Sequence, residues 1–409
     1  MSKPKSRVIT VRVVGPLAPY ARQFTSLLAE RGYTPLSRVS QLQVMVHLSK
    51  WLRGRGLDVV DVTFERVDEY LTQRRAEGYS SFCSRVSLEQ LLDVLGRCGA
   101  PLVEPTLPGS EVDTLLAGFA GYLRQERALA ASTTTAYVLR ARRFVNGYGH
   151  DADLTQLGSG DVTRAVLREA GTVTAGSAQF FVVALRSFLR YGYLTGLIHT
   201  DLSGASLPVT GRRRSVLPQG IGPAAAKALL GSCDRRTAVG RRDYAVILIL
   251  LRLGLRACEV AALRLPDIDW RAGRITVHGK GQRVDQLPLP VDVGAAIAAY
   301  LRHARPRTDR REVFLRMTAP RTGLDRGGVS LIVRRACVRA GLAPCGSHRL
   351  RHSLACDMVR AGVPLQEIGQ VLRHRDATST SIYARVDIDQ LRTVARPWPQ
   401  RATPQGATR

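Results

Sequence analysis

The spacing of apolar residues predicts a mostly helical chain. Between about residues 19 and 105, apolar side chains such as Leu27, Leu28, Val44, Met45 and Leu48 recur at intervals typical of one face of a helix. A second helical block is predicted from about 110 to 206, with helices at 112–123, 133–148, 162–170 and 178–193. Both blocks contain an aromatic-bearing helix, a short Leu/Val stretch and another helix, which raises the hypothesis that the first duplicates the second.

The remaining part of the chain mixes helices with two short strands. Segments 274–278 and 283–288 flank Gly279-Lys280-Gly281 and predict a hairpin. Helices are expected at 224–230, 241–253, 256–263, 291–303, 328–340, 349–361 and 365–372. A last helix is expected after Tyr383, to end before Pro397. The predicted fold class is therefore mostly α with a small β-hairpin or sheet in an α+β C-terminal domain, preceded by helical N-terminal domains.

Proline and glycine clusters mark the expected domain limits. Pro101, Pro105 and Pro108 separate the helical blocks, and a segment from Pro208 to Pro218 carries three consecutive arginines. The predicted organisation is an extended N-terminus (1–18), an accessory helical domain (19–105), a second helical domain (110–206), a basic linker (207–218), the α+β domain (219–395) and a flexible tail (396–409).

The balance of charge indicates an anionic polymer as partner. The chain of 409 residues has 60 Lys or Arg against 33 Asp or Glu, a formal net charge of +27. The basic residues are spread along the chain, which favours nucleic acid over a membrane-surface anchor. Lysine occurs at only five positions (3, 5, 50, 227 and 280). One of them, Lys280, lies between two glycines in the predicted hairpin, which favours a chemical role for it.

Several classes of protein are not supported by the sequence. The longest apolar run, Tyr244 to Leu251, has eight residues, far short of the roughly 20 that cross a membrane. The N-terminus has no signal-peptide pattern, so we expect a cytoplasmic, nucleoid-associated protein. The seven cysteines form no CxxC and no zinc spacing, and there is no Walker loop, dinucleotide-binding glycine pattern or HExxH. We expect no cofactor and no metal.

One candidate motif for chemistry is Ser347-His-Arg-Leu-Arg-His-Ser353. His348 and Arg351 are three residues apart on a predicted helix and therefore share a face. His352 is expected to point elsewhere, as a packing or hydrogen-bonding residue. By itself, one arginine beside one histidine is as typical of a surface pair as of an active site.

Three further segments carry titratable residues. Arg256 follows a glycine turn at the start of a predicted helix, and Glu259, one turn on, is placed to hold that helix or the arginine as structural support. His374 lies in Val371-Leu-Arg-His, and Tyr383 lies nine residues later in Thr380-Ser-Ile-Tyr. Taken singly, these are as compatible with a structural ion pair and a packed tyrosine as with catalysis.

Together the motifs resemble those of the tyrosine recombinase, or phage integrase, family. The matching elements are Gly-Leu-Arg-x-x-Glu, His-x-Leu-Arg-His-Ser, Leu-x-His and Thr-x-x-Tyr, and the match covers about residues 250–390. The block 110–206 resembles the family's core-binding domain. Arg373 stands where the family usually has glycine. The resemblance implies a catalytic set of Arg256, Lys280, His348, Arg351, His374 and the nucleophile Tyr383.

The resemblance implies a site-specific recombinase or integrase that cuts and rejoins DNA. Tyr383 would attack a phosphodiester, form a covalent 3′-phosphotyrosine and release a 5′-hydroxyl, without ATP or metal. Elementary chemistry agrees, because arginines that stay protonated can neutralise the anionic diester, a histidine (His348) can take the phenol proton and a lysine (Lys280) can protonate the leaving oxygen. Strand exchange in the family runs on a homo-tetramer that synapses two specific sites in double-stranded DNA.

Two alternative functions stay open at this point. A type IB topoisomerase-like relaxation of DNA strands would use the same residue types, and a non-catalytic architectural DNA-binding protein would need only the basic surface. In all three cases DNA contacts are expected from basic side chains, with no membrane partner. The candidates are Arg212, Arg213 and Arg214 in the linker, Arg283 beside the hairpin, and Arg334, Arg335 and Arg339 on a helix.

Residues 1–105 exceed the simplest members of the family. They are interpreted as an arm-type DNA-binding module, a duplicated clamp unit or a contact for accessory proteins encoded by the same element. A bacterial mobile-element integrase, active in transposition, is the expected setting.

Overall fold

The computed structural model describes residues 11–102, 111–149, 153–210, 220–279, 283–374 and 378–383. By internal contacts the chain divides into two compact units. One comprises Met1–Val60, Gln73–Ala100 and Val216–Arg409, and the other comprises Asp61–Thr72 and Pro101–Ser215. The predicted domain limits, and the hypothesis of a duplicated helical block, stay predictions.

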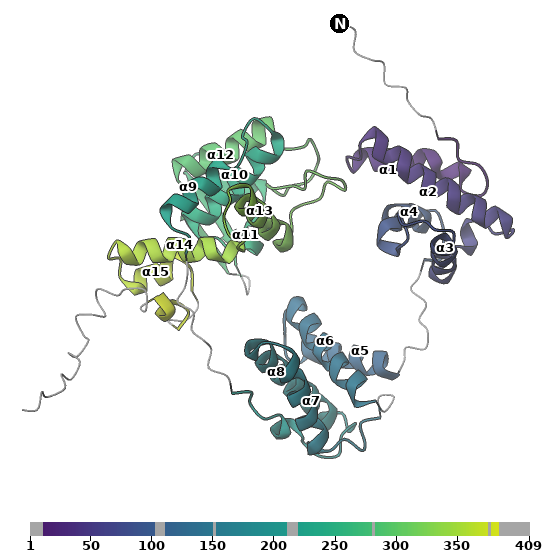
Figure 1. The fold of residues 1–409 in the computed structure, drawn as a ribbon, viewed down its shortest axis with the longest axis horizontal. Helices are drawn as coiled ribbons and strands as arrows, with labels where there is room; N and C mark the ends of the chain where they lie inside the picture. The colour runs from purple at the N-terminus through teal and green to yellow at the C-terminus, as the bar shows by residue number, and fades with distance from the viewer. Residues whose placement is uncertain are drawn as a thin grey trace, which may run out of the picture. The chain divides into compact units, whose positions relative to one another are not determined.

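The first helices follow the predicted apolar pattern (Figure 1). They are α1 (Ala21–Glu30), α2 (Pro35–Gly54), α3 (Phe64–Ala76) and α4 (Arg85–Arg97). Helix α2 begins where the hydroxyl oxygen of Thr34 accepts the backbone N–H of Ser37 and Pro35 occupies the first turn, both of which favour a helix start. Phe24, Leu28 and Leu48 of α1 and α2 are buried, as their spacing predicts.

The second helical block also forms as predicted. It contains α5 (Glu111–Gln125), α6 (Ala131–Tyr148), α7 (Ser159–Thr172) and α8 (Ala175–Leu194). Phe119, Phe144 and Phe188 meet in its core, where the ring of Phe188 packs edge-on against both others at centroid distances of 5.2 and 6.1 Å. Edge-to-face aromatic packing of this kind adds to the stabilisation from buried area.

The C-terminal domain, residues 220–383, is built around α10. Its helices are α9 (Pro223–Gly231), α10 (Ala238–Leu253), α11 (Ala257–Ala262), α12 (Val291–His303), α13 (Arg326–Arg339), α14 (Ser347–Arg360), α15 (Leu365–Val371) and α16 (Thr378–Ser381). Residues Ala245–Leu250 of α10 are buried on all sides, and α10 contacts α9, α11, α12, α13 and α14. This explains why the longest apolar run in the sequence lies here.

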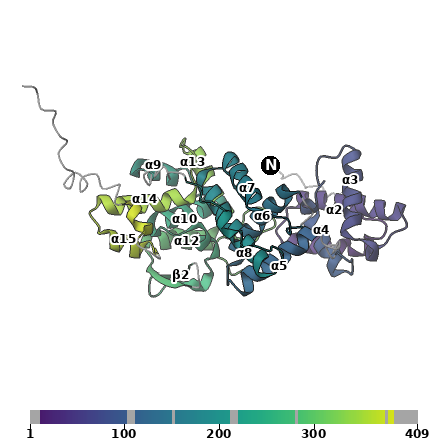
Figure 2. The ribbon, with the colours of Figure 1, turned by 90° about the horizontal axis from the view of Figure 1, so that it is seen from below.

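A three-stranded antiparallel sheet completes the domain. Its strands are β1 (Ile268–Asp269), β2 (Arg274–His278) and β3 (Val284–Pro288), in that order. In the β2–β3 hairpin Arg274 pairs with Pro288 and His278 with Val284. Lys280 falls between the two strands in sequence, outside the described residues. Figure 2 shows the sheet at the edge of the domain's helices.

The predicted fold class is therefore confirmed: the chain is mostly helical with one small sheet. The predicted hairpin and each predicted helix up to residue 372 are present, although α6, α7, α8, α10, α13 and α14 begin two or three residues earlier than expected. The two-residue strand β1 was not predicted. The helix expected after Tyr383 lies outside the described residues.

Two expectations from the sequence concern the helices and the cysteines. None of the described helices is both long and apolar enough to cross a membrane. All seven cysteines are free thiols.

The buried hydroxyl of Tyr300 provides a test of the C-terminal core. Its oxygen accepts the backbone N–H of Leu315 at 3.2 Å, and the ring is fully buried against Phe314. Tyr300→Phe leaves that N–H without a partner, so we expect the free energy of unfolding of this domain to fall by about 1–3 kcal/mol. Hydrogen exchange of the α10 and α12 amides measures the change. Tyr193→Phe, at an exposed tyrosine of α8, should leave this exchange unchanged.

Candidate active site

Arg256 lies where α10 ends and α11 begins. Gly254 ends α10 in the left-handed conformation (φ +58°), and Arg256 precedes the first residue of α11. The Arg256 backbone N–H donates to Glu259 Oε2 at 2.8 Å, which caps the helix, and its Nη1 donates to Glu259 Oε1 at 2.8 Å. The side chain of Arg256 is still 37% exposed. Its guanidinium is thus oriented by Glu259 and accessible to a ligand.

Glu259 is a buried carboxylate shared by two arginines. Besides Arg256, its Oε2 accepts Nη2 of Arg373 at 2.8 Å, and both Glu259 and Arg373 are almost fully buried. The carbonyl oxygen of Arg373 lies 3.5 Å from Nη2 of Arg256. The predicted supporting role of Glu259 agrees with these contacts, and Arg373 is a partner that the sequence did not predict.

Arg351, on the inner face of α14, is 2% exposed and is held by backbone carbonyl groups. It donates through Nη1 to the carbonyl of Gly254 and through Nη2 to that of Leu372, the residues that end α10 and α15. The C-terminal ends of helices carry partial negative charge and stabilise a cation. Burial, followed by the charges of Arg256 and Arg373, lowers the pKa of Arg351 to about 10, so the group stays charged at neutral pH.

His348 and His352 lie one above the other on α14. Their ring centroids are 4.3 Å apart in an edge-on arrangement, because residues four apart share a helix face. The expectation that His352 points elsewhere is wrong, although it is a hydrogen-bonding residue as predicted. Partial burial of the His348 ring, with the charges of Arg351 and Arg256, lowers its pKa, so the imidazole is neutral at physiological pH.

Tyr383 is 1% exposed in the described structure. It packs with Ala355, Cys356 and Leu372 in a small cluster beneath α14 and α15. Its hydroxyl lies 2.6 Å from Nδ1 of His352. Burial raises the pKa of Tyr383 to about 12, and the nearby charge of Arg351 opposes that rise. The residue that contacts the phenol is thus His352, and its i, i+4 spacing from His348 is the signal that could have identified it.

His374 belongs to the same group of side chains. Its ring is parallel to that of Tyr383 at a centroid distance of 6.4 Å, and its Nδ1 lies 2.6 Å from Oγ1 of Thr380 in α16. The structure therefore brings together five of the six predicted catalytic residues, from segments up to 127 positions apart: Arg256, His348, Arg351, His374 and Tyr383. Lys280, the sixth, lies outside the described residues, as do the linker residues Arg212, Arg213 and Arg214.

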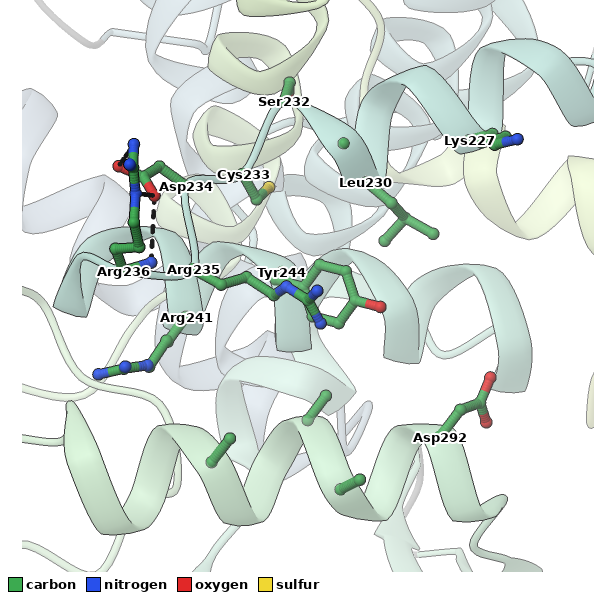
Figure 3. Close-up of a pocket in the computed structure, with 14 residues that line it drawn as sticks. Lys227, Leu230, Ser232, Cys233, Asp234, Arg235, Arg236, Arg241, Tyr244 and Asp292 are labelled. Carbon is green, nitrogen blue, oxygen red and sulfur yellow. Dashed lines mark hydrogen bonds and ion pairs between the residues drawn. The ribbon is translucent and has the colours of Figure 1, made fainter.

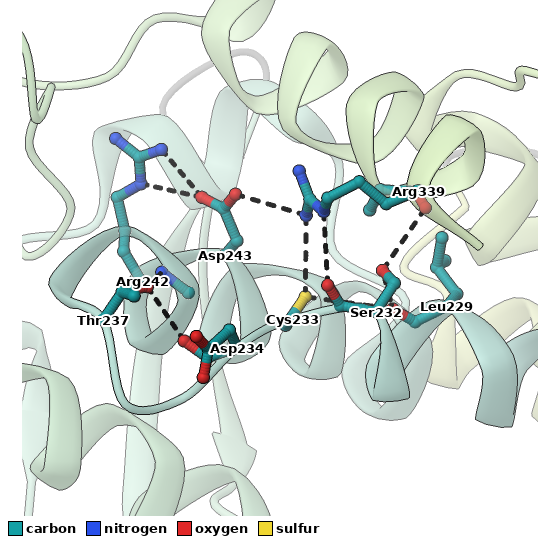
Figure 4. A network of polar contacts seen from close by, with 10 residues as sticks. Leu229, Ser232, Cys233, Asp234, Thr237, Arg242, Asp243 and Arg339 are labelled. Carbon is teal, nitrogen blue, oxygen red and sulfur yellow. Dashed lines mark hydrogen bonds and ion pairs between the residues drawn. The ribbon is translucent and has the colours of Figure 1, made fainter.

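The remaining predicted DNA-contact arginines have different surroundings. Arg283, Arg334 and Arg335 are exposed, and Arg283 pairs with Asp285 at 3.0 Å. Arg339 is exposed as well, and it takes part in a polar network (Figure 4) in which its Nε donates to the Ser232 carbonyl at 3.2 Å and its Nη2 lies 3.6 Å from Asp243. All four assignments stay predictions.

A cavity of about 1210 Å³ opens elsewhere in the C-terminal domain (Figure 3). It is bounded by α9, α10 and α12, with the guanidinium of Arg235 4.8 Å from the ring centroid of Tyr244. None of the predicted catalytic residues that the structure describes lines this cavity. Among the described residues, no three His, Cys, Asp or Glu side chains are placed to hold a metal ion.

Known proteins similar in sequence are integrases and recombinases. The phage integrase family model matches residues 221–389. The integrase/recombinase y4rA of Sinorhizobium fredii (strain NBRC 101917 / NGR234) is 41% identical over 95% of this chain and 96% of its own length. Tyrosine recombinase XerD of Listeria monocytogenes serotype 4b (strain F2365) is 30% identical over 71% of this chain and all of its own length.

Solved structures with a similar fold are recombinase complexes. The XerH site-specific recombinase bound to palindromic difH substrate, in a post-cleavage complex, has a TM-score of 0.57, with 18% identity over 69% of this chain and 96% of that one. A dimer of residues 75–356 of lambda integrase bound to a COC′ core site has a TM-score of 0.53, with 17% identity over 70% and 98%.

The histidine cluster predicts how stability depends on pH. Burial, followed by the charges of His348 and Arg351, lowers the pKa of His352 to about 4, against about 6.5 when unfolded. The folded chain therefore binds fewer protons than the unfolded chain, and stability present above pH 6.5 is lost as the pH falls toward 4. We expect the melting temperature to fall over this interval, and less so in His352→Asn, which cannot titrate. His303→Asn, at an exposed histidine of α12, should show the wild-type slope; an unchanged slope in His352→Asn would contradict the assignment.

Proposed function

The chain belongs to the phage integrase family of tyrosine recombinases, enzymes that transfer DNA strands, and we propose that it cuts and rejoins specific DNA sites through a covalent 3′-phosphotyrosine at Tyr383. The observation that carries this proposal is the convergence of Tyr383 with Arg256 and Arg351 in one domain. Burial raises the pKa of the Tyr383 phenol, and the charge of Arg351 opposes that rise. Burial and the charges of Arg351 and Arg256 lower the pKa of His348, so all four groups lie close together.

The arginines supply the electrostatic part of the mechanism. A phosphodiester is anionic, and a nucleophile approaches it only when that charge is neutralised. Arg256, oriented by Glu259 and still accessible, can donate to a non-bridging oxygen. Arg351 is buried and held by two carbonyls in the described structure, and we propose that it donates to the phosphate once DNA binding opens the cluster around it. Loss of one such preorganised donor typically lowers a rate about 100–1000-fold.

The phenol must lose its proton as it attacks phosphorus. In the structure a neutral imidazole, His352, contacts the hydroxyl, whereas His348 lies one turn away beside His352. We propose that His348 acts as the general base and His374 as a further donor to the phosphate once DNA is bound, with Tyr383 released from His352. Proton transfer by a placed histidine is typically worth about 100–10,000-fold in rate.

Lys280 is proposed as the general acid that protonates the leaving 5′-oxygen. It falls between β2 and β3 in sequence, and a lysine, unlike an arginine, can give up a proton when its pKa is lowered. The ester energy is then stored in the protein–DNA bond, so that a 5′-hydroxyl from another strand can reverse the step. The reaction needs no ATP, and we propose no metal and no other cofactor.

We propose double-stranded DNA with specific recombination sites as the substrate and a homo-tetramer as the synaptic assembly. Arg283, Arg334 and Arg335 are exposed and available for phosphate contacts. The linker arginines 212–214 and the accessible part of Arg339 are proposed to add to them. Contacts of this kind make affinity fall steeply with salt concentration. The expected setting is a mobile genetic element in the cytoplasm, with accessory proteins of the element as further partners.

The two alternatives are less well supported. A type IB topoisomerase-like enzyme would share the chemistry, but the relatives that match most of this chain are integrases and recombinases. An architectural protein would have no use for a tyrosine, two arginines and three histidines gathered at one point.

A suicide substrate tests the proposed chemistry. DNA covalently captured by the wild-type protein is first mapped to define a core site, and a duplex of that site is then nicked next to the cleavage point so that religation fails. The wild-type protein should form an adduct that resists SDS, and Tyr383→Phe should form none while still binding the duplex. Tyr193→Phe, at an exposed tyrosine of α8, serves as the matched control and should form the adduct. Failure of the wild-type protein to form an adduct on any element-end or genomic DNA would favour the architectural alternative.

The role proposed for residues 1–105 is accessory binding of DNA or of a partner protein. A chain lacking these residues should therefore cleave a short core site within about tenfold of the wild-type rate, because the proposed catalytic residues all follow residue 255. Cleavage rates on the short site and on a longer DNA with flanking sequence distinguish the outcomes. Complete loss of cleavage on the short site, with the C-terminal domain still folded by circular dichroism, would refute an accessory role.

A further inference from the structure

Arg373 carries two features that are unfavourable in a folded chain. It adopts the left-handed backbone conformation (φ +54°) directly after the residue that ends α15, a position that favours glycine. Its Nε and Nη1 are buried and have no hydrogen-bond partner among the residues that the structure describes, which is costly for a charged group. Backbone strain and unsatisfied buried donors at one residue beside a reaction site point to a function.

Within the described part of the chain, the Arg373 side chain donates its one hydrogen bond to Glu259. That carboxylate also receives Nη1 and the backbone N–H of Arg256, so two guanidiniums share one negative charge. If Arg256 were the sole partner of Glu259, the pair would be neutral overall and would attract a phosphate weakly. With Arg373 present, Arg256, Arg373 and Glu259 together carry one net positive charge. Arg351 adds a second positive charge, and its partners are neutral backbone carbonyls and not a carboxylate.

From these contacts, and resting on the proposed function, we propose that Arg373 is a positioning residue that offsets the charge of Glu259 and so keeps Arg256 available to the scissile phosphate. In this proposal Arg373 does not itself contact the DNA, because its guanidinium is both buried and bound to the Glu259 carboxylate. Its effect reaches the phosphate through Glu259 and Arg256. A chain with glycine at this position would keep the turn and lose the compensating charge.

The first test compares two variants in single-turnover cleavage of the nicked suicide substrate. Arg373→Gly suits the left-handed backbone and removes the charge, so the fold should persist while the cleavage rate falls at least about tenfold. Arg373→Lys keeps the charge and should stay within about threefold of wild type. DNA affinity should be equal in all three proteins. Arg360→Ala, at an exposed arginine of α14 paired with Asp357, controls for loss of positive charge elsewhere in the domain.

The second test is a double-mutant cycle with Glu259→Gln. If Arg373 acts by offsetting the Glu259 charge, then adding Arg373→Gly to Glu259→Gln should lower the rate by less than about threefold, in contrast to its effect in the wild type. A substrate with a neutral methylphosphonate at the cleaved position gives a third readout, because the Arg373→Gly defect should shrink when the phosphate carries no charge.

These outcomes separate the inference from the proposed function. Lack of an adduct with the wild-type protein would defeat the proposed function itself. Wild-type cleavage with an unaffected Arg373→Gly would overturn only the role of Arg373. An equal loss of cleavage rate in Arg373→Gly and Arg373→Lys would show a structural role and would also overturn the inference. The same holds if Arg373→Gly lowers the rate equally with and without Glu259→Gln.

Discussion

The site depends on burying positive charge without an equal amount of acidic charge. Arg351 is almost fully enclosed, yet its hydrogen-bond partners are the carbonyl oxygens of Gly254 and Leu372. Carbonyl dipoles at the ends of two helices offset the cost of burial while the net charge stays positive. A carboxylate in their place would make the pair neutral and reduce its attraction for an anionic ester. Helices α10, α14 and α15 therefore have to meet at this arginine.

The tyrosine is held in the opposite way, by features that make it unreactive. Burial raises the pKa of Tyr383, and its hydroxyl is engaged by His352. A phenol that is both protonated and enclosed is a poor nucleophile. Under the proposed function, the described arrangement is a resting one, in which Arg256 is accessible and the proposed nucleophile Tyr383 is not yet released.

Much of this architecture could be predicted from the sequence. The apolar periodicity located the helices, and the glycines around Lys280 located the hairpin. The order and spacing of Arg256, His348, Arg351, His374 and Tyr383 resemble those of the tyrosine recombinase family, and that resemblance implied a shared site, which the structure brings together. The helices and the hairpin follow from periodicity within short segments, which a single sequence shows. The site follows from motifs that resemble those of a known family.

The contacts missed by sequence reasoning depend on tertiary geometry. His352 contacts Tyr383 because the segment after α16 packs against α14. The apolar pattern of neither segment predicts this contact. Arg373 looked like a departure from a glycine position, and its burial against Glu259 requires two segments 114 residues apart to meet. Three consecutive residues after α15 thus serve different partners: Leu372 holds Arg351, Arg373 holds Glu259, and His374 stacks on Tyr383. For anyone building chimeric integrases, segment 365–383 is not a transplantable module, because it has to be inherited together with α11 and α14.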